Sequence, residues 1–302
     1  MSKPYNPTNF ENLQLIGSGS SGDVYKAYSK EHNLSVVIKV LNKRKNKESS
    51  ILSEVSILTK LHSSCEKNIV CYVDFMEDAK NFYIIMEYLG EYILLSDYIM
   101  SNTVTASTFV KIAENLKNGM SLYHKYEVAH RDVKPDNIMI NPTTLDIKYI
   151  DFGFACTGDT CYDAHTIGTP LYYAPELLGH MSTVPQNFKQ WALADYWSLG
   201  MTILELILKR PFIDYYNEKL YGRIPEHIGD IVAIDKILLV GGVTMADIED
   251  CCRDFLGDNE RLKIYVKMTL VWLLKGNPKQ RVLILNKTAN LDRMKFETVQ
   301  LI

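Results

Sequence analysis

Residues 130–137 read HRDVKPDN, and residues 151–153 read DFG. Each charged side chain in these stretches, taken alone, is most simply explained as a solvated loop residue. Further short motifs stand on both sides of them in order: GSGSSGDV at 17–24, VVIK at 36–39, APE at 174–176, DYWSLG at 195–200 and an arginine at 281. One triplet recurs often by chance, but seven motifs in register with the predicted secondary structure do not. The set therefore decides the fold.

The composition is that of an ordinary globular protein. The chain has 302 residues, of which 47% are hydrophobic and 23% charged, which excludes disordered and fibrous classes. Its net charge of -3 gives no overall positive field for nucleic acid or anionic membranes. No leader segment or apolar stretch long enough to span a membrane is present. The 6 cysteines are irregularly spaced, which argues against a disulfide framework and favours a reducing, cytoplasmic location.

The order of predicted elements divides the chain into a strand-rich and a helix-rich part. A meander of three strands is followed by a helix with apolar residues at helical spacing, and then by two more strands. The strands cover residues 13–17, 23–29, 35–41, 69–75 and 81–89, and the helix covers residues 45–62. Helical patterns dominate from Ser96 onward, so we place a boundary at Leu89 and Gly90. The expected protein is α+β, with a small sheet lobe (1–89) and a larger helical lobe (90–302).

Gly17, Gly19 and Gly22 follow a GxGxxG spacing between two predicted strands. Glycines let the backbone fold closely over a polyphosphate and offer its N–H groups. The same spacing occurs in dinucleotide-binding folds, where the third glycine opens a helix, and in plain tight hairpins. Residues 23–29 have a strand pattern, which favours a strand-turn-strand cover over phosphates.

With all seven motifs in place, the sequence resembles the eukaryotic protein kinase family, serine/threonine branch, over residues 10–285. The resemblance implies a bilobal fold, with a small antiparallel sheet and one helix in the N-terminal lobe. It also implies ATP and Mg²⁺ (or Mn²⁺) as cofactors, and transfer of the γ-phosphate to Ser/Thr hydroxyls of protein substrates. Lys134 favours this branch over tyrosine kinases, and GTPLYY at 168–173 resembles the segment that docks peptide substrates.

The resemblance also assigns catalytic roles. Asp132 would accept the hydrogen bond and proton of the attacking hydroxyl, and Lys134 would neutralise the γ-phosphate. Lys39 would hold the α and β phosphates, and it needs a carboxylate partner on the helix that follows. Glu54 is the preferred partner, and Glu48, at the start of that helix, is the alternative.

Metal and adenine contacts follow from the same motifs. Asp151 resembles the ligand of the metal bridging the β and γ phosphates, and Asn137 the amide ligand of the second metal. Adenine would stack between apolar side chains and bond to the hinge backbone. These residues are Val24, Val37 and Met139 for the stacking, Glu87, Tyr88 and Leu89 for the hinge, and Met86 as the gatekeeper. Val37 stands where the family usually has alanine, so ATP is expected to bind less tightly. Asp195 and the Glu176–Arg281 pair resemble structural braces.

Several alternatives remain open at this level. A pseudokinase scaffold would have lost a lysine, aspartate or metal ligand, and a lipid or small-molecule kinase would lack the APE segment. The basic run at 43–47 is a solvated loop or a nuclear-localisation patch. Cys156, Cys161 and His165 are loosely spaced like zinc ligands, but a fourth ligand is not evident. Arg131 is expected to meet a phosphate on Thr166, or else an aspartate of the same segment.

Overall fold

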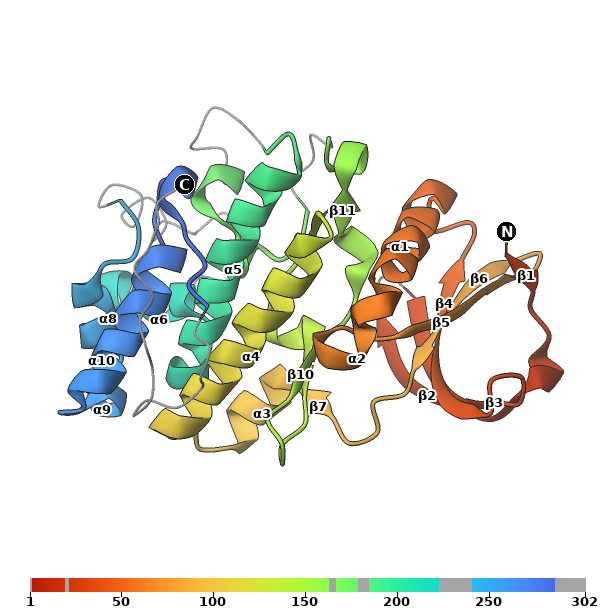
Figure 1. Cartoon of the computed structure of the whole chain (residues 1–302), viewed down its shortest axis with the longest axis horizontal. Coiled ribbons are helices and arrows are strands. Elements are labelled where there is room, and N and C mark those ends of the chain that lie inside the picture. The colour runs from red at the N-terminus through yellow and green to blue at the C-terminus, as the bar shows by residue number, and fades with distance from the viewer. Residues whose placement is uncertain (1, 20–21, 163–166, 179–184, 223–240, 286–302) are drawn as a thin grey trace.

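The computed structural model describes residues 2–19, 22–162, 167–178, 185–222 and 241–285. Two lobes lie side by side, a sheet lobe containing the N-terminal strands and a helical lobe containing the rest of the chain (Figure 1). The expected bilobal α+β architecture is confirmed. The boundary predicted at Leu89 and Gly90 falls in the segment between strands β6 and β7, and it stays a prediction.

A six-stranded sheet forms the N-terminal lobe, in the order β1-β5-β6-β4-β3-β2. Its strands are β1 (Lys3–Pro4), β2 (Phe10–Gly19), β3 (Gly22–Ser29), β4 (Leu34–Asn42), β5 (Tyr72–Glu77) and β6 (Asn81–Glu87). The five predicted strands are β2 to β6, and all four of their contacts are antiparallel, as expected. The sequence pattern missed β1, which pairs with β5 in parallel.

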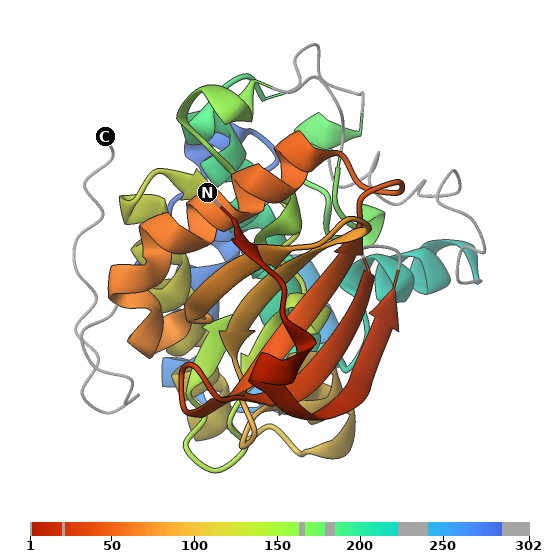
Figure 2. The same ribbon diagram turned by 90° about the vertical axis from the view of Figure 1, so that its right-hand side faces the viewer.

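Helix α1 (Glu48–Leu61) packs against this sheet and faces the other lobe (Figure 2). Ile51, Leu58 and Leu61 are buried on one side of the helix, as the apolar spacing predicts. Glu54 is buried on the same helix. The expected single helix is extended by a 3-10 turn at His62–Ser64 and a short helix, α2 (Cys65–Asn68), so the lobe has more helix than predicted.

The C-terminal lobe is built around two long helices, α4 (Ala106–Lys125) and α5 (Phe188–Leu208). Trp191 and Trp197 of α5 are fully buried in the hydrophobic core of this lobe. The other helices are α3 (Leu95–Ser101), α6 (Phe212–Tyr221), α8 (Met245–Cys251), α9 (Arg253–Leu256) and α10 (Glu260–Val266), which runs into a π-helical turn at Lys267–Val271. Within the described ranges, none of the helices is both long and apolar enough to cross a lipid bilayer.

Short strands at the junction of the lobes carry the site. They are β7 (Ile93–Leu94), β8 (Val128–Ala129), β9 (Ile138–Ile140), β10 (Ile147–Tyr149) and β11 (Cys156–Thr157). β7, β9 and β10 form one sheet, and β8 pairs with β11 in another. The catalytic loop predicted at residues 130–137 therefore runs between β8 and β9.

Two disulfides correct the expectation that the irregularly spaced cysteines form no disulfide framework. Cys65 is joined to Cys71 and Cys156 to Cys161, with Cα atoms 4.8 and 4.9 Å apart. The expectation rested on the absence of a long-range framework, but separations of 6 and 5 residues need only a local turn. The second pairing also removes the zinc alternative for Cys156 and Cys161, and His165 lies outside the described residues. Whether the compartment is reducing stays a prediction.

Candidate active site

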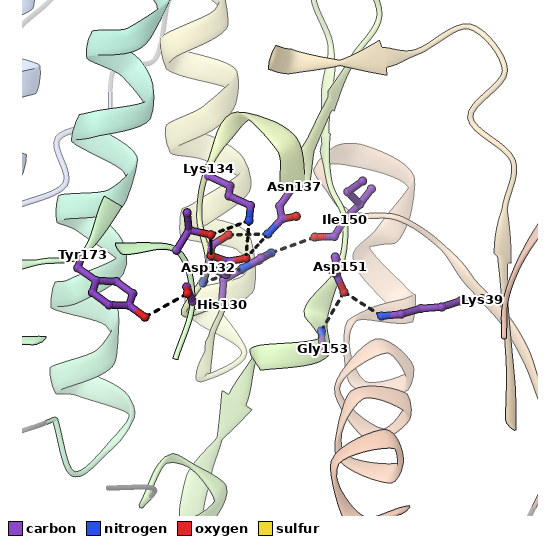
Figure 3. Close-up of polar contacts among 11 residues, drawn as sticks. Lys39, His130, Asp132, Lys134, Asn137, Ile150, Asp151, Gly153 and Tyr173 are labelled. Atoms are coloured by element: carbon purple, nitrogen blue, oxygen red, sulfur yellow. Dashed lines mark hydrogen bonds and ion pairs between the residues drawn. The ribbon is translucent and has the colours of Figure 1, made fainter. Parts of the chain in front are cut away.

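Lys39 is a buried lysine that contacts two carboxylates, and its contact with Asp151 is drawn in Figure 3. It lies in β4 between β3 and β6, and its Nζ is 2.8 Å from Glu54 Oε1 and 2.8 Å from Asp151 Oδ1. Glu48, the alternative partner, is exposed at the first residue of α1. The structure therefore brings Glu54, rather than Glu48, to the lysine.

Lys39 and Asp151 keep their charges in this cluster, whereas burial, together with the like charge of Asp151, raises the pKa of Glu54 against the opposing charge of Lys39. Burial alone would lower the pKa of Lys39, but the charges of Glu54 and Asp151 outweigh burial and raise it above its ordinary value. Burial would likewise raise the pKa of Asp151, yet the lysine charge and hydrogen bond hold it below its usual range. Lys39 therefore stays protonated and Asp151 stays ionised throughout the neutral pH range.

Asp132 lies in a second polar group on the loop after β8. Its Oδ2 accepts a hydrogen bond of 2.7 Å from Asn137 Nδ2, and its Oδ1 accepts one of 2.8 Å from Thr169 Oγ1. Lys134 Nζ is 3.2 Å from Asp132 Oδ2 and 2.6 Å from Thr169 Oγ1. A hydroxyl, in this case that of Thr169, thus lies between the aspartate and the lysine, which is the position that an acceptor hydroxyl would need.

The loop is held in shape by a buried carboxylate from α5. Asp195 accepts hydrogen bonds from the backbone N–H groups of His130 and Arg131, at 2.8 and 2.9 Å. Arg131 needs this support because its φ is 66°, in the left-handed region. The His130 ring also bonds to the carbonyl of Ile150, which ties this loop to the residue before Asp151 (Figure 3). The catalytic loop and the segment that carries Asp151 are therefore fixed relative to each other.

The glycine-rich segment forms the end of the β2–β3 hairpin. Gly17 pairs with Val24 and Gly19 with Gly22, and residues 20–21 between them lie outside the described residues. Gly22 has a φ of 141°, and a Cβ there would lie 2.2 Å from the carbonyl oxygen of Val40. Fold geometry thus requires glycine at this position. Around Gly19, by contrast, none of the described residues other than its chain neighbours lies within 4 Å of an added Cβ, so its backbone is open to a ligand.

An apolar pocket lies beside Lys39 and Asp151 at the junction of the lobes. It is lined by the expected residues Gly17, Val24, Val37, Met86, Glu87, Tyr88, Leu89 and Met139. Sequence reasoning missed Ile16, Leu94 and Ile150, which also line it. Ile16 directly precedes the glycine motif and Ile150 directly precedes DFG, so their neighbouring motifs could have identified them. The walls are mostly aliphatic, which suits a flat aromatic ring.

The donor set fits a divalent cation. The amide nitrogen of Asn137 is committed to Asp132, at 2.7 Å from Oδ2 and 2.8 Å from the main-chain oxygen, which leaves the amide oxygen to face a ligand. The side chain of Asp151 is 40% exposed, so it can reach a cation in the cleft. Both offer hard oxygen atoms of the kind that Mg²⁺ and Mn²⁺ prefer. Three carboxylates and two lysines meet here, and their net charge of -1 also favours a cation.

The activation segment, residues 151–176, begins at DFG and ends at APE. Arg131 Nε donates a hydrogen bond of 2.5 Å to the carbonyl of Phe154, and the guanidinium lies 5.1 Å from the centre of the Trp191 ring. At the far end, Arg281 forms a two-point ion pair with Glu176, with both distances 2.7 Å, as expected of a structural brace. Thr166 lies outside the described residues.

Comparison with known proteins agrees with this geometry. The family model described as protein kinase domain matches residues 10–286. The chain belongs to the protein kinase family. The serine/threonine-protein kinase shk1/pak1 of Schizosaccharomyces pombe is 34% identical over 221 residues, 71% of this chain and 31% of that protein. STE20 of Saccharomyces cerevisiae is 34% identical over 214 residues, and human ULK1 is 33% identical over 219.

All three relatives are named serine/threonine-protein kinases. The matches to STE20 and ULK1 cover 70% and 67% of this chain but only 21% and 20% of those proteins. The chain thus spans less than a third of the length of the curated relatives it matches. Membership of the family implies ATP as the phosphate donor, a divalent metal ion and protein substrates.

Proposed function

We propose that this kinase is catalytically active and transfers the γ-phosphate of Mg²⁺-bound ATP to serine or threonine hydroxyls of protein substrates. The observation that carries the proposal is the hydroxyl of Thr169, which is 2.8 Å from Asp132 Oδ1 and 2.6 Å from Lys134 Nζ. A substrate hydroxyl in that position would meet a proton acceptor and a cation together. We also propose that residues 1–89 bind ATP and residues 90–302 dock the substrate, in the cytoplasm with possible access to the nucleus.

The roles of the site residues follow from charge and position. Lys39, oriented by Glu54, would bind the α and β phosphates, and the open backbone near Gly19 would lie over them. Asp151 and Asn137 would hold the metal, Mg²⁺ by preference and Mn²⁺ as the alternative. The metal, when bound, neutralises negative charge that spreads over the phosphoryl oxygens during transfer.

The catalytic loop would act on the acceptor. Asp132 would orient the hydroxyl and take its proton as the new phosphate–oxygen bond forms and the bond to the β-phosphate oxygen breaks. Lys134 would stabilise the charge on the transferred group. Asn137 keeps the Asp132 carboxylate in place through its amide nitrogen. Val24, Val37 and the other walls of the apolar pocket would hold the adenine ring, with the backbone of Glu87 and Leu89 as its polar contacts.

Radiolabelled ATP and a degenerate set of Ser, Thr and Tyr peptides test the proposal. We expect phosphoserine or phosphothreonine as products, and loss of activity on Asp132→Asn. Asp146→Asn, in the exposed turn between β9 and β10, is the matched control and should keep full activity. Absence of transfer by the wild-type protein with either Mg²⁺ or Mn²⁺ would contradict the proposal, as would products that are mainly phosphotyrosine.

A further inference from the structure

Residues 156–161 form a covalently closed loop inside the activation segment. The Cys156–Cys161 disulfide closes it, and both cysteines are fully buried. Its first two residues are strand β11, which pairs with β8 immediately before the catalytic loop, Cys156 opposite Ala129 and Thr157 opposite Val128. Cys156 is therefore paired with the residue directly before His130, where the catalytic loop begins.

The same loop contacts two further parts of the site. The carbonyl of Cys161 accepts a hydrogen bond of 3.1 Å from Trp191 Nε1, and the Arg131 guanidinium lies over that tryptophan ring. On its other side, Lys60 Nζ of α1 donates a hydrogen bond of 2.8 Å to Thr157 Oγ1. The closed loop thus contacts helix α1, which carries Glu54, and Trp191 of α5, over which Arg131 lies.

We propose that the Cys156–Cys161 disulfide is a redox modification that positions the activation segment for phosphoryl transfer. Reduction to two thiols would release the segment and lower turnover. This inference rests on the proposed kinase activity, and it deepens that activity by naming its regulation. The disulfide closes residues 156–161 by a bond within the loop, and this contact does not depend on a phosphate near Arg131.

The redox step is a thiol–disulfide exchange with a small-molecule disulfide such as oxidised glutathione. One cysteine thiolate attacks the small disulfide and releases one thiol, and the second cysteine then displaces the other thiol as the protein S–S bond forms. The two cysteines together lose two electrons and two protons, and the small disulfide is reduced to two thiols. In a reducing compartment, a disulfide of this kind is typically transient and redox-sensing.

The burial of both sulfur atoms has a kinetic consequence. Exchange requires an attacking thiolate to reach a sulfur, so the loop must first open locally. Gly158 and Thr160, between the cysteines, are exposed, so opening can begin there. Closing a loop with a separation of 5 residues favours its ordered form about 30-fold, equivalent to about 2 kcal/mol.

The test compares oxidised and reduced wild-type protein, which needs no substitution. After equilibration with oxidised glutathione or with dithiothreitol, thiol mapping by mass spectrometry assigns the state of each cysteine. We expect amide hydrogen exchange within residues 156–161 to be about 30-fold faster after reduction. We expect kcat to fall on the order of tenfold, with KM for ATP changed less than about twofold, and to recover on reoxidation.

Variants separate this disulfide from the other one. The double variant Cys156→Ala/Cys161→Ala should have the low kcat of the reduced protein and should not respond to reductant. Cys251→Ala, which removes a free thiol on α8, is the matched control and should respond as the wild type does. A double variant that still responds would assign the effect to Cys65–Cys71 and overturn the proposal.

The hydrogen-exchange arm also distinguishes failure of this inference from failure of the proposed function. If neither redox state transfers phosphate but hydrogen exchange at residues 156–161 changes as expected, the proposed kinase activity is wrong. The disulfide then still orders the loop, but only as a structural feature. If thiol mapping confirms that the disulfide is reduced, and both hydrogen exchange and kcat are unchanged, the redox proposal is wrong whether or not the protein is an active kinase. If the Cys156–Cys161 disulfide does not form in oxidised glutathione, the redox proposal is also wrong.

Discussion

Replacing Glu54 by glutamine keeps the shape of the side chain and removes its charge. Lys39 Nζ is 2.8 Å from Glu54 Oε1, and the two side chains are 8% and 5% exposed, so solvent screens the pair little. A hydrogen bond to a charged group contributes about 1.5–3 kcal/mol. If that energy orients Lys39 in the transition state, its loss lowers kcat about 10-fold to 100-fold. Asp151, also 2.8 Å from Lys39, would then hold the lysine alone.

The assay is steady-state kinetics on five proteins: wild type, Glu54→Gln, Lys39→Met, the double variant, and Glu48→Gln. Glu48 lies on the same helix but is exposed, so its substitution is a matched control and should change kcat less than about twofold. Because Lys39 and Glu54 act as one pair, the double variant should lose about 2 kcal/mol less than the sum of the single losses. Thermal unfolding of each variant checks that it is folded.

Two results would refute this reasoning. Strictly additive losses from Lys39→Met and Glu54→Gln would mean that the pair does not act as a unit in the transition state. A loss in Glu48→Gln as large as that in Glu54→Gln would mean that the helix turns during catalysis and presents a different carboxylate. In either case the geometry seen here would not be the working geometry.

Three further predictions concern the nucleotide and the effect of pH. Asp132→Asn should lower kcat by about 10²-fold to 10⁴-fold with little change in nucleotide affinity, whereas Asp151→Asn should weaken the binding of metal-ATP. Equal losses of nucleotide affinity in the two variants, measured by calorimetry, would contradict these roles. Val37→Ala should enlarge the adenine pocket and lower the Kd for ATP several-fold, measured by the same titration; an unchanged or higher Kd would show that Val37 does not crowd the ring. Glu205 accepts a hydrogen bond from Tyr172, and burial raises its pKa from 4.5 to about 7. The folded protein therefore binds the Glu205 proton more tightly than the unfolded chain does. As a result, the folded protein loses stability as the pH rises from 4.5 through 7. In urea unfolding, Glu205→Gln should therefore be more stable than the wild type at pH 8, by at most about 3 kcal/mol, and an equal pH slope in both proteins would show that the group is not responsible.

The local motifs predicted which residues lie together at the candidate site. The apolar spacing of residues 45–62 placed Glu54 on a helix, and VVIK placed Lys39 in a strand, so their meeting needed only the approach of two neighbouring elements. Such predictions succeed because each motif fixes its own backbone shape.

Features that depend on distant pairing were missed. Strand β1 is two residues long and exists only because Lys3 and Pro4 lie beside Met76 and Glu77, so no local periodicity could reveal it. The disulfides were missed for a different reason. Whether Cys156 reaches a second cysteine depends on the turn between them, and sequence spacing alone does not determine that turn.

The hydrogen bonds from the catalytic loop to Asp195 can form only late in the synthesis of the protein. The Asp195 carboxylate lies 65 and 64 positions after the backbone groups of His130 and Arg131 that it binds. A nascent chain that has just emerged from the ribosome through DFG already contains Lys39 and every metal-binding residue named above. It still lacks the acceptor that holds Arg131 in its left-handed conformation. If the proposed activity needs this loop conformation, we expect phosphoryl transfer to begin only after helix α5 has been translated and has docked.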